Sequence, residues 1–240
     1  MTRNRKIELL GELGAKILND QHLRDLWAQG ASEENLWFTK DFTITAMTNI
    51  AKHYLDASAL ENWCLNYTES DESRVVGLIL AGNIPLVGIH DLLAVWLSGH
   101  KAKIKPSSKD SFLIQTFVHE LEKLDPEAVH AFQFVDQLKE VDAVIATGSD
   151  NTNRYFEYYF RDIPHILRKN RVGISILTGN EDETELKGFV RDVLLFFGLG
   201  CRSTSKFYLP NDYNMESLQA YFADWTSLLD HPKFKNNYDY

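Results

Sequence analysis

Three short segments carry side chains able to do chemistry, and the first is the turn AGNIPL at residues 81–86. It follows a continuous apolar run, residues 74–81, that is typical of a strand buried on both faces. Ligands of open α/β sheets bind beyond the carboxyl ends of strands, so the Asn83 amide is placed to donate a hydrogen bond to a developing oxyanion. Alternatively, Asn83 caps a following helix whose first turn contains Pro85. Spacing alone favours the cap.

The second segment is HKAKIKPSSK, residues 100–109. Lys101, Lys103 and Lys105 alternate with apolar residues, so they share one face of a short predicted strand. A basic edge at the carboxyl end of a strand can hold the phosphates or ribose of a nucleotide. A solvated charged face is the simpler interpretation, and this segment alone favours it; the Lys105-Pro106 end is its more specific part.

The third segment is FFGLGCRSTSKFYLP, residues 196–210. Its Gly-Leu-Gly turn allows tight backbone geometry and close approach of a substrate to Cys201. A thiol becomes a useful nucleophile when positive charge lowers its pKa, and Arg202 is adjacent. Against this, an isolated cysteine is more often a small buried hydrophobic residue. We expect that structural role for Cys64.

The elements that must position these side chains alternate between strand and helix from residue 74 onward. We expect strands at residues 74–81, 102–105, 131–135, 143–147, 172–177 and 206–209, and helices at 109–123, 151–160, 183–197 and 215–229, besides the one after Pro85. This alternation predicts an α/β fold with a mostly parallel sheet and helices on both faces. Earlier residues show only helical spacing, over 7–18, 23–29 and 42–55.

Composition excludes several functional classes. The 240 residues carry 25 Lys and Arg against 34 Asp and Glu, a net charge of −9, which argues against nucleic-acid or anionic-membrane binding. The apolar stretch 75–97 is long enough to cross a bilayer, but Asn83, His90 and Asp91 near its middle exclude a membrane span. Two widely separated cysteines predict neither a disulfide framework nor a metal site, so a reducing cytoplasm is the expected compartment.

The order of the motifs NIPL, SGHKAKIKPS, ATGS (residues 146–149) and GLGC resembles the aldehyde dehydrogenase superfamily. More narrowly, the chain resembles the acyl-CoA reductases of bacterial luminescence, the LuxC-type fatty-acid reductases, from about residue 75 to 210. The resemblance implies a Rossmann-type parallel sheet with three parts: a helical N-terminal region (1–70), a nucleotide-binding domain (71–175) and a partial catalytic domain (176–240). It also implies that the chain is shortened at its C-terminus.

The resemblance also assigns roles to individual residues. Cys201 would be the acylated nucleophile, and Asn83 would donate to the oxyanion together with the Cys201 backbone N–H. Lys105 and Ser107 would contact the cofactor ribose, and the Gly-Ser pair at Gly148 and Ser149 would begin a helix beneath the pyrophosphate.

Two departures from the family pattern are informative. Leu167-Arg168-Lys169 stands where hydrolytic dehydrogenases carry a Glu general base, and its loss suits a thioester that must survive until hydride arrives. Ser108, expected to contact the cofactor, replaces a ribose-binding Glu. Without a carboxylate that would repel a 2′-phosphate, NADPH is favoured, and NADH remains open.

The implied reaction is acyl transfer from a coenzyme A thioester to Cys201, followed by hydride transfer that yields an aldehyde. Two alternatives stay open. One is a nucleotide-binding or interaction module without turnover, because few residues follow Cys201; the other is an acyl-phosphate reductase, which would need phosphate-binding Arg or Lys groups. The aromatic run 155–160 could line an acyl tunnel, although helical spacing favours a place in the core. A homo-oligomer or an acyl-transfer partner subunit is compatible with the sequence.

Overall fold

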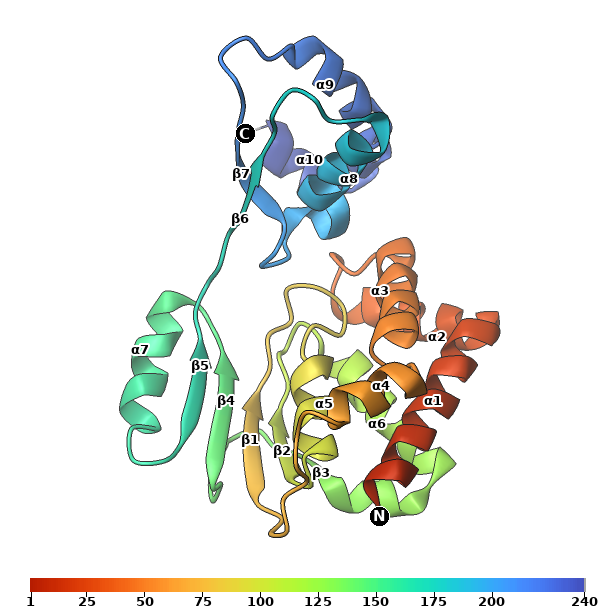
Figure 1. Cartoon of the computed structure of the whole chain (residues 1–240), viewed down its shortest axis with the longest axis vertical. Coiled ribbons are helices and arrows are strands. Elements are labelled where there is room, and N and C mark those ends of the chain that lie inside the picture. Colours follow the sequence, from red (N-terminus) through yellow and green to blue (C-terminus); the bar gives the residue numbers. More distant parts are fainter. Residues whose placement is uncertain (240) are drawn as a thin grey trace. The chain divides into compact units, whose positions relative to one another are not determined.

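The computed structural model describes residues 1–239 and forms two compact units, Met1–Lys169 and Asn170–Tyr240. The first unit is built on a five-stranded sheet in the order β3-β2-β1-β4-β5, with every pair of neighbours parallel (Figure 1). Its strands are β1 (Val75–Ile79), β2 (Lys101–Lys105), β3 (Phe132–Phe134), β4 (Ala143–Thr147) and β5 (His165–Arg168). The predicted parallel α/β sheet is confirmed.

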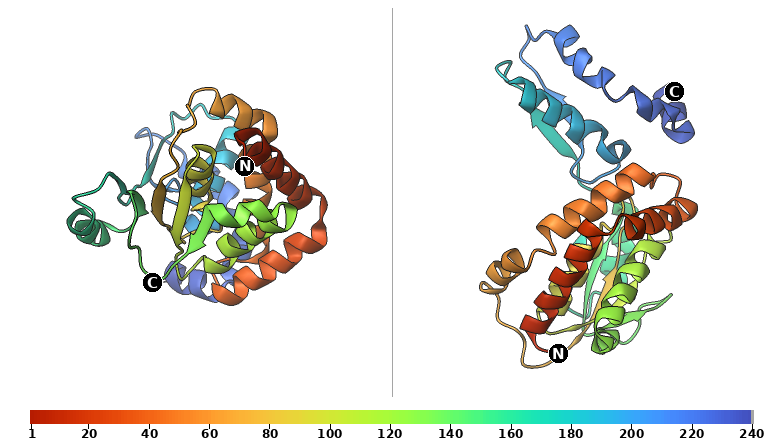
Figure 2. Two further views of the ribbon diagram at one scale, coloured as in Figure 1. Left: turned by 90° about the horizontal axis from the view of Figure 1, so that it is seen from below. Right: turned by 90° about the vertical axis from the view of Figure 1, so that its right-hand side faces the viewer.

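Helices cover this sheet on both sides: α1 to α6 gather on one side and α7 lies on the other (Figure 2). They are α1 (Arg3–Asn19), α2 (Gln21–Glu34), α3 (Lys40–His53), α4 (Ala57–Cys64), α5 (Ile89–Leu97), α6 (Ser111–Leu124) and α7 (Asp150–Tyr159), with a 3-10 helix at Pro126–Ala131. The helical layer before residue 70 is confirmed.

The amphipathic spacing of the N-terminal helices explains how they pack. Leu9, Leu10, Leu13 and Ile17 of α1 follow a helical period and are fully buried. They belong to one hydrophobic core together with sheet residues such as Leu78. The helical layer and the sheet are therefore a single packed body.

Helix α5 begins later than the sequence suggests. Its N-cap is Gly88, and Pro85 lies in the preceding turn. The helix cannot extend back through Leu86, because the backbone of that residue is left-handed, with φ of 57°. Gly99 ends the helix region with φ of 92°, as the left-handed cap that its residue type predicts.

The second unit pairs two parallel strands with three helices. These are β6 (Gly173–Ile176), β7 (Thr204–Tyr208), α8 (Glu183–Leu194), α9 (Met215–Ala223) and α10 (Pro232–Asp239). A capping box between Asp182 and Glu185 fixes the start of α8. The core of the unit is small, with Leu177, Phe189 and Leu218 among its few buried residues.

Two helices of this unit are shorter than predicted. Helix α8 ends at Leu194, because Phe196 and Phe197 adopt left-handed backbones with φ of 53° and 56°. Their apolar character suits a helix, but the Phe197 ring packs 5.2 Å from the ring of Phe234, between centroids. The predicted helix 215–229 likewise ends at Ala223 and continues as a 3-10 turn, Thr226–Asp230.

Among the described residues, none of the helices has the length and apolar character needed to cross a membrane. Within the same part of the chain, no cluster of three His, Cys, Asp or Glu side chains is arranged to hold a metal ion.

Candidate active site

The turns singled out in the sequence of the first unit meet at one edge of the sheet. Because the strands are parallel, the ends of β1, β2, β4 and β5 lie together. At these ends or just after them are Asn83, the Lys105–Ser108 segment, Gly148-Ser149 and Arg168. The chain proceeds from β1 outward to β2 and β3, then returns to β4 on the other side of β1. This reversal is the topological switch point at which α/β sheets bind ligands.

The Asn83 turn is packed tightly against the turn that follows β2. A Cβ atom added at Gly82 would lie 2.5 Å from the Ser107 hydroxyl oxygen, so only glycine fits there. Asn83 is half-buried, and since the N-cap of α5 is Gly88, the helix-cap interpretation of Asn83 is wrong. The Asn83 turn, predicted to face an oxyanion, and the turn after β2, predicted to contact the cofactor, are therefore neighbours.

A buried carboxyl group joins these two turns. Oδ2 of Asp110, which is 1% exposed, accepts a hydrogen bond of 2.8 Å from the backbone N–H of Leu86. Burial raises the pKa of Asp110 well above its usual range; the Leu86 bond opposes this and the Glu34 charge adds to it. Oδ1 has no hydrogen-bond partner. Asp110 precedes α6 without capping it, and Glu34 of α2 instead accepts from the Phe112 backbone N–H at 3.1 Å.

The β2 turn presents polar groups to solvent. Lys105 and Ser108 are exposed, and the half-buried Ser107 accepts a hydrogen bond from the Lys109 backbone N–H at 3.2 Å. The predicted alternation is present, since Lys101 and Lys105 are exposed on β2 and the intervening Ala102 and Ile104 are buried.

The Gly148-Ser149 turn begins α7, as the resemblance implied. Ser149 is the N-cap, and its hydroxyl accepts from the Thr152 backbone N–H at 3.3 Å. The side chain of the fully buried Asn153 donates to the carbonyl oxygens of Gly148, Ser149 and Arg168 at 2.9 to 3.1 Å. These bonds tie the turn to the end of β5.

An ion pair spans the switch point. Arg168, at the end of β5, donates from Nη1 to both carboxylate oxygens of Asp91 at 2.5 and 2.6 Å. The Asp91 side chain, in the first turn of α5, is 9% exposed. Burial raises its pKa, but hydrogen bonds from His90 and Arg168 outweigh burial and leave the pKa below its usual value. Asp91 is therefore held charged and is a poor base.

Cys201 belongs to the second unit and lies in the turn that leads into β7. It is exposed, so the buried interpretation is wrong for Cys201, whereas Cys64 is buried as expected. Gly198 takes the left-handed conformation expected of the Gly-Leu-Gly turn, with φ of 68°. The backbone N–H of Ser203 closes the turn on the Gly200 carbonyl oxygen at 3.0 Å.

The aromatic run on α7 occupies neither a core nor a tunnel within its unit. Tyr155, Tyr158 and Tyr159 are 66% to 71% exposed. These tyrosines do follow helical spacing, but the buried residue of this helix is the polar Asn153, whose burial its residue type does not predict.

Asp91, Asp110 and Asn153 are the site residues that sequence reasoning missed. A signal existed for Asp91, a lone acid in the apolar helix IHDLLAVWL. Buried acidic side chains are rare unless they are paired or neutral. The position of Asp91 in an apolar helix therefore indicates that it has a partner, but it does not identify that partner as Arg168.

The fold is that of the aldehyde dehydrogenases. The chain is similar to aldehyde dehydrogenase 21 from Physcomitrella patens, with a TM-score of 0.72 and 12% identity over 95% of this chain and 52% of that one. It is also similar to a propionaldehyde dehydrogenase from Clostridium phytofermentans, with a TM-score of 0.70 and 12% identity over 93% of this chain and 55% of that one.

Within this fold, the chain belongs to the acyl-CoA reductase (LuxC) family, whose model matches residues 45–216. It is also similar to the long-chain acyl-protein thioester reductase of Aliivibrio fischeri, with 26% identity over 208 residues. The match covers 78% of this chain and 42% of that protein, so the chain spans less than half the length of this curated relative.

Proposed function

We propose that this chain contributes the nucleotide-binding sheet and the nucleophile of an NADPH-dependent reductase that converts a long-chain acyl thioester to an aldehyde. The observation that carries the proposal is the family match over residues 45–216, which includes both the Asn83 turn and Cys201. The acyl donor is a coenzyme A thioester. The name of the Aliivibrio fischeri relative extends the donors to an acyl group carried on a protein.

The residues at the carboxyl edge fit a nicotinamide dinucleotide. Ser107 and Ser108 offer hydroxyl groups, and Lys105 and Lys109 add positive charge. The one acid in residues 105–110, Asp110, is buried and has a raised pKa, so it presents no exposed charge to repel a 2′-phosphate. This supports NADPH over NADH. When bound, the cofactor supplies the hydride.

In this mechanism the Cys201 thiolate attacks the thioester carbonyl carbon, and the C–S bond to the donor breaks. The donor leaves as a thiolate that takes up a proton, and the acyl group remains on Cys201 as a thioester. A bound cofactor would supply the hydride that reduces this thioester carbonyl, and the Cys201 sulfur would then leave as a thiolate as the aldehyde is released. Asn83 stabilises the oxyanion in both steps.

The charge pair at the switch point leaves Asp91 unable to act as a water-activating base. A water-activating base needs a free carboxylate with a pKa near the working pH. Asp91 is bound by Arg168 and its pKa is lowered, so it does not fill this role.

The experiment that tests the proposal is incubation with dodecanoyl-CoA followed by intact mass measurement. We expect a hydroxylamine-labile dodecanoyl adduct that is absent in Cys201→Ala and retained in the matched control Cys64→Ala, because Cys64 is buried. If the wild-type protein never acquires an adduct, the proposed reaction is refuted for this chain.

A second candidate function is a nucleotide-binding module without turnover. The groups that would hold the nucleotide, among them Lys105 and Ser107, all lie in the first unit, whereas Cys201 lies in the second. Saturable NADPH binding by a protein that is never acylated would establish this module. Acylation by an acyl phosphate in preference to a thioester would instead identify the acyl-phosphate reductase.

A further inference from the structure

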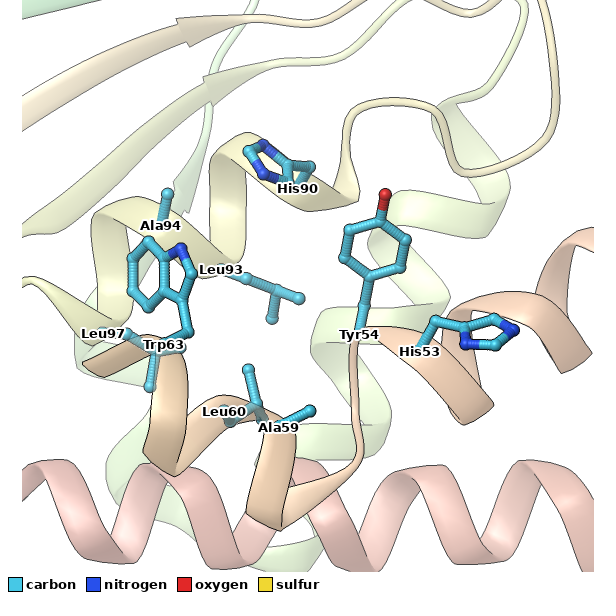
Figure 3. Close-up of a pocket in the computed structure, with 9 residues that line it drawn as sticks. All are labelled: His53, Tyr54, Ala59, Leu60, Trp63, His90, Leu93, Ala94 and Leu97. Carbon is cyan, nitrogen blue, oxygen red and sulfur yellow. The ribbon is translucent and has the colours of Figure 1, made fainter. Parts of the chain in front are cut away.

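A hollow of about 180 Å³ lies in the first unit, between the end of α3, helix α4 and helix α5 (Figure 3). Its floor is formed by leucine side chains that are 1% to 7% exposed: Leu60, Leu93 and Leu97. Trp63 and Tyr54 stand on opposite sides of it. The interior is therefore aliphatic and aromatic.

Apart from the indole N–H of Trp63, the polar groups of the hollow lie at its His90 and Tyr54 end (Figure 3). The rings of His90 and Tyr54 meet edge to face with centroids 5.9 Å apart, and both residues are exposed at the rim. The His53 side chain is directed away from the hollow (Figure 3). A ligand with many hydrogen-bonding groups would find few partners inside, whereas a hydrocarbon chain would bury its surface there.

The hollow is oriented along α5 toward the candidate active site. Helix α5 starts at the carboxyl edge of the sheet and returns to the opposite edge, because it connects the parallel strands β1 and β2. His90, Leu93, Ala94 and Leu97 follow the spacing of one helix face, which extends ~10 Å at 1.5 Å per residue. The His90 end is the one at the active-site edge, in the turn of helix that follows the Asn83 loop.

We propose that this hollow, the α3–α5 hollow, binds the hydrocarbon chain of the acyl donor. The chain enters beside His90 and runs along α5 toward Leu97. This inference rests on the proposed function, which supplies an acyl donor as the occupant, and the family match begins at residue 45 and so includes the whole hollow. The helix face that lines the hollow extends ~10 Å, so the hollow can take up part of an extended hydrocarbon chain.

The test measures binding separately from chemistry, in a Cys201→Ala background that cannot be acylated. We expect the affinity for acyl-CoAs, measured by titration calorimetry, to rise with chain length beyond butyryl by about fourfold per buried methylene, until the hollow is filled. Ala94→Trp, which fills the half-buried middle of the hollow, should abolish this rise with chain length.

The matched control is Ala220→Trp, which adds the same side chain at an exposed position on α9. If Ala94→Trp and Ala220→Trp both keep the wild-type rise with chain length, the chain binds elsewhere and the inference is refuted. Binding of free dodecanoate without any gain for dodecanoyl-CoA over butyryl-CoA refutes it as well, because the occupant is then not the acyl donor. Ala94→Leu gives the same comparison if the tryptophan variant does not fold.

Failure of the proposed function gives a different pattern. Suppose that the wild-type protein, with Cys201 intact, is never acylated, but that acyl-CoA affinity still rises with chain length and Ala94→Trp abolishes the rise. The hollow then stands as the acyl site, and only the proposed reaction is refuted. If the protein is acylated equally well by butyryl-CoA and dodecanoyl-CoA, with no loss in Ala94→Trp, the reaction stands and the hollow is excluded.

Discussion

Asp110→Asn should make the free energy of unfolding of the protein less dependent on pH. In the folded chain burial raises the pKa of Asp110, the hydrogen bond from Leu86 opposes this, and the charge of Glu34 raises the pKa further; the balance lies well above the usual value. In the unfolded chain the same carboxyl group titrates at about pH 4. The folded state therefore binds this proton more tightly than the unfolded state.

The sign of the pH dependence follows from that difference. Above about pH 4 the unfolded chain releases the proton first, so the contribution of Asp110 to stability falls as pH rises, until pH passes the folded-state pKa. The slope is at most about 1.4 kcal/mol per pH unit. Asparagine releases no proton, and its carbonyl oxygen can still accept from the Leu86 N–H. The free energy of unfolding of Asp110→Asn minus that of the wild type should therefore increase with pH.

Urea unfolding followed by tryptophan fluorescence measures this difference, because four of the five tryptophans lie in the first unit. Asp110→Ala is the control: it also cannot titrate, but it leaves the buried Leu86 N–H unpaired and should be about 1–3 kcal/mol less stable than Asp110→Asn at every pH. If the free energy of unfolding of Asp110→Asn minus that of the wild type stays constant between pH 4 and pH 7, the buried carboxyl group is not held protonated and the reasoning is refuted.

Two further substitutions test contacts at the sheet edge. Arg168→Met should lower the free energy of unfolding by about 1–3 kcal/mol, because it leaves the buried Asp91 carboxylate with His90 in place of a bidentate partner. Adding Asp91→Asn should recover most of this loss. Urea unfolding of the single and double variants checks this, and no recovery would show that the pair is not the cause. Gly82→Ala should lower the thermal midpoint because the new methyl group meets the Ser107 hydroxyl. The double variant Gly82→Ala/Ser107→Gly should regain most of the lost thermal midpoint. If the single and double variants lose the same number of degrees, the clash with Ser107 is not the cause.

The parallel sheet and most helices could be predicted because their signals are local. The run before residue 81 is continuously apolar, as burial on both faces requires, and α1 repeats its leucines at helical period. Strand β5 was missed because it lies at the edge of the sheet, where His165 and Ile166 are exposed and no continuous apolar run is needed. The helix predicted over residues 183–197 extended too far, because the residue types of Phe196 and Phe197 do not indicate that their backbones are left-handed.

The candidate site was predictable only where a turn follows a strand. Lys105 and Ser149 sit at strand ends that the apolar pattern locates, so their shared edge follows from parallel pairing. The links between those turns are long-range: Arg168 meets Asp91, and Asp110 meets Leu86. Spacing along the chain carries no information about such pairs, because which partner satisfies a buried polar group depends on the tertiary fold.

The core shared by the N-terminal helices and the sheet sets a lower limit on how small a fragment that carries the sheet and its carboxyl-edge turns can be. A fragment starting at residue 71 would keep every strand of the first sheet yet lose Leu9, Leu10, Leu13 and Ile17 from its core. Each loss removes about 1.5–3 kcal/mol of burial and exposes the apolar surface that it covered. Such a fragment should aggregate when expressed. The smallest segment of the first unit that folds is therefore larger than the sheet and the turns at its carboxyl edge.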